Sequence, residues 1–100
     1  MARDSYAYRQ VAVHSVQRRG AVAIHPVPGQ AFSPALPVQC SQRLKDLDTY
    51  PLGTCFLLDA KLTDRLGRDQ YLYAWHGDAV QVLSAQQVKA FLAEFRRGRI

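Results

Sequence analysis

Two runs of alternating side chains, Cys55–Thr63 and Tyr71–His76, constrain the fold of this chain most strongly. The first run places an apolar set on one side and a mixed set on the other, as a half-buried β-strand requires. The second run is rich in aromatic residues, which strands favour. The segment Asp64–Arg68 joins the runs and carries Gly67, so the sequence predicts a β-hairpin.

A second hairpin is predicted upstream, where Tyr6–Gln17 and Ala21–Val27 flank Arg18-Arg19-Gly20. Both turns show two residues followed by glycine. This pattern favours a three-residue loop, a type I turn whose glycine adopts a left-handed conformation and forms a bulge.

The C-terminal segment predicts one amphipathic helix over residues 84–97. Ser84 and Gln87 have the spacing of a capping box. An apolar stripe follows at helical spacing, and it consists of Val88, Phe91, Leu92 and Phe95. A helix of this length is marginal in water, so we expect the stripe to be buried against a sheet.

The middle of the chain is irregular, because prolines interrupt residues 26–37. After this proline-rich loop, Val38–Ser41 suits a short edge strand. Arg43–Leu47 suits one helical turn with Leu44 and Leu47 facing inward. A last short strand is expected at Ala79–Leu83, with Val80 and Val82 on one face.

These elements predict one domain, residues 1–100, of the mainly β class. We expect five to six short strands in a β-barrel-like or strongly bent antiparallel sheet, with one C-terminal helix. No apolar run reaches the ~18 residues of a membrane span, so no membrane association is expected.

The chain is basic, with 13 Lys and Arg against 8 Asp and Glu and a net charge of +5. Arginine dominates, which suits phosphate contacts but also follows from the codon usage of GC-rich bacterial genomes. The two cysteines, Cys40 and Cys55, are too few for a disulfide framework. Free thiols in a reducing compartment are expected, which indicates a cytoplasmic protein.

The alternate residues Tyr71, Tyr73 and Trp75, here called the aromatic ladder, point to one face of their strand. With Arg65-Leu66-Gly67 as the loop, Lys61 lies opposite Tyr71, and the ladder lines a mixed, partly exposed surface. A slip of one residue reverses the faces and sends the ladder into the core. The sequence leaves both registers open.

Basic residues gather at turns and at the C-terminus. Arg18 and Arg19 belong to one predicted turn, and Arg65 and Arg68 to the other. If the turns converge, they form a phosphate-binding rim beside the ladder, whereas a scattered arrangement is ordinary surface charge.

Catalytic and metal motifs are not found. His14, His25 and His76 have no metal-ligand spacing with the cysteines or acids, although His14 and His25 can face each other across two strands. The glycines are isolated in turns and form no phosphate loop. We therefore expect no metal, no cofactor and no enzymatic activity.

The leading hypothesis is a small basic binding module that contacts nucleic acid. Its predicted binding residues are Tyr71, Tyr73, Trp75, Lys61, Arg18, Arg19, Arg65 and Arg68. The alternative is a protein-interaction module, such as an inhibitor, an immunity or accessory subunit, or a homodimer, that uses the same aromatic face. A third hypothesis, a small-molecule pocket inside the barrel, has less support.

Overall fold

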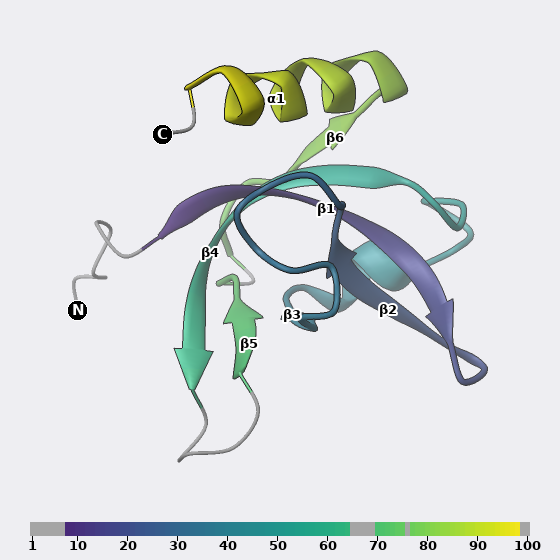
Figure 1. The fold of residues 1–100 in the computed structure, drawn as a ribbon. Helices are drawn as coiled ribbons and strands as arrows, with labels where there is room; N and C mark the ends of the chain where they lie inside the picture. Colours follow the sequence, from purple (N-terminus) through teal and green to yellow (C-terminus); the bar gives the residue numbers. More distant parts are fainter. Residues whose placement is uncertain (1–7, 65–69, 76, 99–100) are drawn as a thin grey trace.

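The computed structural model describes residues 8–64, 70–75 and 77–98 (Figure 1). Its elements in chain order are β1 (Arg9–Arg18), β2 (Ala21–Pro26), β3 (Val38–Gln39), the 3₁₀ turn η2 (Gln42–Lys45), β4 (Cys55–Asp64), β5 (Gln70–Tyr73), β6 (Gln81–Leu83) and α1 (Ala85–Gly98). The mainly β class with one C-terminal helix is confirmed.

The strands form a six-stranded sheet in the order β2-β1-β4-β5-β3, and β6 pairs with β4. All pairs are antiparallel except β3–β5, which is parallel, so the sheet is mixed. The outermost strands β2 and β3 lie side by side, but no ladder joins them. The sheet is therefore strongly bent and is not a closed barrel.

Strand β4 is the centre of this arrangement. Its first half pairs with β1 on one side, from Cys55 opposite His14 to Ala60 opposite Arg9. On its other side it pairs first with β6 and then with β5. Figure 1 shows β4 bending between these two halves, with α1 and β6 beside the first half and β5 beside the second.

The core lies on one face of the bent sheet. Strand alternation supplies most of it, and the buried apolar residues are Val11, Val13, Ile24, Val38, Leu44, Phe56, Leu58, Ala60, Leu72 and Ala74. Each larger side chain of this set contributes about 1.5–3 kcal/mol by leaving water. The Tyr50 ring packs edge-on against Phe56, with ring centroids 5.1 Å apart.

The first hairpin is tighter than expected. Arg18 pairs directly with Ala21, which leaves Arg19 and Gly20 as a two-residue loop. Both loop residues have positive φ, 54° and 78°, as a type I′ turn requires. The predicted three-residue loop is wrong here, because a type I′ turn matches the strand twist without a bulge.

The second hairpin has a longer connection than expected. Asp64 pairs with Gln70 and not with Arg68, so the loop spans residues 65–69, which lie outside the described residues. The change from the expected register is two residues, so each side chain keeps its face of the sheet.

Two sequence predictions about side-chain positions are wrong, the inward position of Leu47 and the common face of Val80 and Val82. Leu44 is buried as predicted, but the 3₁₀ turn ends at Lys45 and extended backbone at Asp46 follows, and Leu47 is 43% exposed. Val80 is partly buried against the core, whereas Val82 is 49% exposed. The two valines do not share a face because β6 begins only at Gln81, after Val80.

The helix begins with the predicted capping box. The Ser84 amide donates to Gln87 Oε1 at 2.8 Å, and the Gln87 amide donates to Ser84 Oγ at 3.1 Å. Its docking is only partial, since Val88, Phe91 and Leu92 are half-buried and supply none of the core. The position of the Phe95 side chain is not among the described features. Part of the apolar stripe therefore stays at the surface.

The proline-rich loop is fixed by one glutamine. Gln30 Nε2 donates to the carbonyls of Ala12 and Val27 at 2.7 and 2.8 Å. Gln30 Oε1 accepts from the Ala12 amide at 3.1 Å. The side-chain amide thus pairs with β1 as a further strand residue would, just past Pro26, where β2 ends.

The type I′ turn yields a first prediction. Replacing Arg19 with Asn should stabilise the protein by about 0.5–1 kcal/mol, since Asn tolerates positive φ far better than Arg. Urea unfolding measures the change. The matched control, Gly20→Ala, should lower stability by about 1 kcal/mol or more. A stabilised Gly20→Ala variant would contradict the assigned turn.

Gln30 yields a second prediction. Gln30→Ala should cost about 1–3 kcal/mol, because it leaves the amide of buried Ala12 without its acceptor, whereas the Ala12 carbonyl keeps the Val27 amide as a donor. Urea unfolding again provides the measurement, with Gln42→Ala in exposed η2 as the control. Equal, small losses in both variants would show that Gln30 does not anchor the loop.

Candidate functional site

The aromatic ladder lies outside the core. Tyr73 is opposite Lys61, and Tyr71 is opposite Thr63. Directly opposed residues share a face, so the ladder lies on the mixed side of β4. Between the rings, Leu72 and Ala74 are buried, whereas Tyr71 and Tyr73 are half-buried and Trp75 is 47% exposed. The face that the first register predicts is the one observed.

Two further residues complete this surface. Continuing the β1–β4 register places Tyr8 opposite Lys61, so Tyr8, Lys61 and Tyr73 form a row across three strands. Lys61 Nζ lies 5.8 Å from the centroid of the Tyr8 ring, at cation–π distance. We call Tyr8, Lys61, Tyr71, Tyr73 and Trp75 together the aromatic face.

The indole of Trp75 packs against Gly77. A β-carbon at Gly77 would lie only 2.6 Å from Cη2 of the indole. The outer edge of the ring therefore lies against the Gly77 backbone, and a larger residue at position 77 would displace the ring.

Arg18 and Arg19 of the predicted arginine rim lie at the end of the sheet away from the ladder. Arg18 and Arg19 are exposed at the tip of the β1–β2 hairpin, which extends away from β5 in Figure 1. The register agrees, since Arg18 lies beyond the Cys55 end of β4 and β5 pairs with the opposite end. The structure therefore does not bring Arg18 and Arg19 to the ladder. Arg65 and Arg68 lie outside the described residues.

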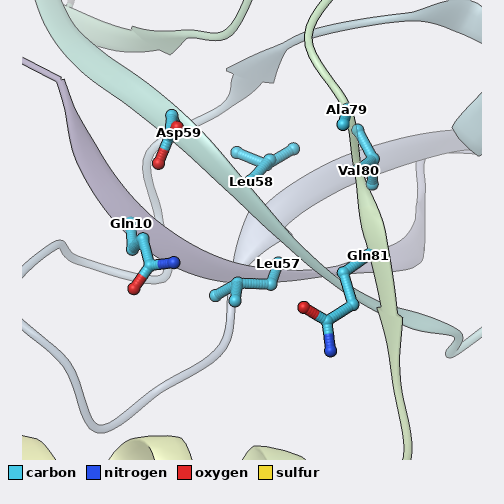
Figure 2. A pocket seen from close by; sticks show the side chains of 7 residues that line it. All are labelled: Gln10, Leu57, Leu58, Asp59, Ala79, Val80 and Gln81. Atoms are coloured by element: carbon cyan, nitrogen blue, oxygen red, sulfur yellow. The ribbon is translucent and has the colours of Figure 1, made fainter. Parts of the chain in front are cut away.

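A cavity of about 220 Å³ opens next to the aromatic face (Figure 2). It forms where the pairing of β4 is interrupted, because residues 58–60 of β4 face the longer segment 74–80 between β5 and β6. Its lining residues are Gln10, Leu57, Leu58, Asp59, Ala79, Val80 and Gln81. Sequence reasoning missed this cavity, since no local signal marks the interruption.

Asp59 is the charged residue in the lining of this cavity. Lys61 shares a face of β4 with Asp59, but the Lys61 ammonium lies over the Tyr8 ring. Among the described residues, none donates a hydrogen bond to the Asp59 carboxylate or forms an ion pair with it. Asp59 is thus a half-buried residue whose carboxylate has no protein partner among the described residues.

The two histidines on β1 and β2 form the cross-strand pair that the sequence allowed. His14 lies directly opposite His25, and His25 Nδ1 donates to the Pro34 carbonyl at 3.1 Å. Burial lowers the pKa of His14, and the charges of His25 and Arg18 lower it further. Burial and the charge of Arg18 also lower the pKa of His25. Both rings therefore favour the neutral form.

The cysteines lack the features of a nucleophilic site. Both are free thiols, as expected. Burial raises the pKa of Cys40 to about 11, and burial also raises the pKa of Cys55. A raised pKa keeps a thiol protonated and unreactive. Within the described ranges, no three His, Cys, Asp or Glu side chains converge as metal ligands.

Comparison of the chain with protein-family models, curated proteins and solved structures gives no significant match. The part of the chain that the structure describes contains no helix with the length and apolar character needed to cross a bilayer.

The histidine pair predicts a pH-dependent stability. The folded-state pKa of each ring lies below its usual value of 6.5, so the unfolded chain takes up protons first. Stability should be complete above that value and fall as the pH drops through it. We expect a lower urea midpoint at about pH 5.5 than at about pH 7.5.

His14→Gln tests the origin of this effect, because it removes one of the two rings and the repulsion between them. The difference in urea midpoint between the two pH values should be smaller in this variant than in the native chain. An unchanged difference would exclude His14 as a contributor.

Proposed function

We propose that this protein binds single-stranded nucleic acid on the aromatic face. The observation that carries the proposal is the position of the ladder, whose rings stand outside the core while Leu72 and Ala74 between them are buried. Bases of a single strand stack on such rings, and each stacked base contributes about 1–3 kcal/mol.

The geometry favours single strands over duplexes. Stacking needs bases that are splayed out of a helix, and a row of side chains along a strand offers them successive contacts. Trp75 packs against Gly77 with about half of its surface exposed, so its ring is accessible to a base. The described chain has a single α-helix, so it contains no helix-turn-helix pair of the kind that reads a duplex.

The charges near the aromatic face support a modest contribution of phosphate contacts to the affinity for nucleic acid. Lys61 lies within the aromatic face, and the net charge of +5 favours the approach of a polyanion. Arg65 and Arg68 belong to the segment that joins β4 to β5, and we retain them as proposed phosphate contacts. Arg18 and Arg19, at the far end of the sheet, are left out of the proposed site.

A protein-interaction surface is the second proposal. It is supported by large apolar side chains at the surface, with Leu62 and Val82 43% and 49% exposed, and by the half-buried stripe of α1. Light scattering distinguishes the two, because a homodimer would double the mass without added nucleic acid. For either function we propose a cytoplasmic location, which the two free thiols support.

The nucleic-acid proposal predicts the effect of removing a ring. Tyr73→Ala should weaken binding of a short fluorescent single-stranded DNA about 5- to 100-fold, the loss of one stacked base. Tyr73→Phe, which keeps the ring, should bind almost as the native chain does. Fluorescence anisotropy at low salt measures both.

Charge variants provide the control for this measurement. Lys61→Met should reduce the salt dependence of binding by about 0.7 in the slope of log K against log salt, the loss of one phosphate contact. Arg18→Ser with Arg19→Ser should change affinity little. Absence of binding at low salt, or equal affinity of Tyr73→Ala and the native chain, would refute the proposal.

A further inference from the structure

The cavity beside β4 lies next to the aromatic face, on the same side of the sheet. Asp59 and Lys61 are alternate residues of β4, so their side chains share a face and lie about 7 Å apart along the strand. Lys61 is opposite Tyr73 of the ladder, and Asp59 lines the cavity. Neighbouring nucleotides of an extended strand can therefore occupy the ladder and the cavity.

The lining determines which chemical groups can enter. Asp59 supplies a carboxylate, Gln10 directly opposite it on β1 supplies an amide, and Gln81 on β6 supplies another. Figure 2 shows these three side chains around the opening, with Leu57 between them. The described lining contains no Lys, Arg or His to neutralise a phosphate, and the charge of Asp59 would repel one. The cavity suits a flat, partly apolar group that donates hydrogen bonds.

The Asp59 carboxylate is open to a ligand. No described residue donates a hydrogen bond to it, and Lys61 on the same face is engaged with Tyr8. Its oxygens keep contact with solvent, since no fully buried side-chain oxygen of the described residues lacks a partner. A ligand that brings N–H donors to both carboxylate oxygens would replace that water with two charge-assisted hydrogen bonds.

Among the bases, guanine fits this acceptor best. Its Watson–Crick edge carries two adjacent donors, N1–H and the N2 amino group, which match the two oxygens of a carboxylate in a bidentate pair. Adenine and cytosine each place a lone pair beside their single donor group, and that lone pair would face the second oxygen. Thymine and uracil have one N–H between two carbonyl groups, and these carbonyl oxygens would be repelled by the carboxylate.

We propose that the cavity is a guanine subsite, in which the Asp59 carboxylate accepts N1–H and N2–H of one base while its neighbour stacks on the ladder. This inference rests on the proposed binding of single-stranded nucleic acid. It adds a base preference to a surface that otherwise binds by stacking, which is tolerant of sequence.

The experiment compares three fluorescent single-stranded DNA probes of equal length, an all-thymine strand and the same strand with one central guanine or one central hypoxanthine. We expect the guanine probe to bind about tenfold tighter than the thymine probe, as for one bidentate base contact. Hypoxanthine, which lacks the N2 amino group, should lose most of that gain.

Asp59→Asn should abolish the preference, because the amide offers one acceptor and one donor in place of two acceptors. Its affinity for the thymine probe should be equal to or higher than that of the native chain, since a negative charge is removed. Asp48→Asn is the matched control: it makes the same change at an exposed loop position and should keep the guanine preference.

The outcomes separate the two proposals. Equal affinities of the native chain for guanine and thymine probes, with binding still lost in Tyr73→Ala, would overturn the guanine subsite and leave the proposed function standing. Failure of every probe to bind would overturn both. Binding of N-acetyl-arginine amide that disappears in Asp59→Asn, without any guanine preference, would instead assign the cavity to an arginine of a protein partner.

Discussion

The pairing register of β4 is the constraint on which the rest of the structure depends. This strand is held between β1 on one side and both β6 and β5 on the other, so its alternation assigns a face to residues in four strands. Because the side-chain period of a strand is two, a shift by one residue would exchange the core and the surface. The burial of Phe56, Leu58 and Ala60 fixes the choice.

The same strand creates both parts of the proposed site. Its second half positions Lys61 between Tyr8 and Tyr73, and the interruption of its pairing near Asp59 opens the cavity. A continuous β5–β6 strand would have closed that gap with backbone hydrogen bonds. The residues between Tyr73 and Gln81 thus leave part of β4 unpaired on the side of β5 and β6. The cavity lined by Asp59 opens there, next to the rings of the aromatic ladder.

The sequence predicted correctly those helices and strands that are determined by neighbouring residues. The capping box at Ser84 and the alternation after Cys55 are properties of neighbouring residues, and both are observed. The ladder face could be predicted only as one of two registers, because the choice depends on pairing with a distant strand. The parallel β3–β5 pair, the anchor made by Gln30 and the cavity at Asp59 depend on contacts between distant segments, which periodicity does not encode.

The central claim, that the ladder stands on the outer face, can be tested directly by its register. Leu72 donates to the Pro37 carbonyl on the β3 side, so Leu62 and Leu72 form a non-hydrogen-bonded pair across β4 and β5. Such a pair brings the two Cα atoms to about 4.5 Å. The account predicts a strong nuclear Overhauser effect between the Hα protons of Leu62 and Leu72. A strong effect between Leu62 and Tyr71 would place the rings in the core and contradict it.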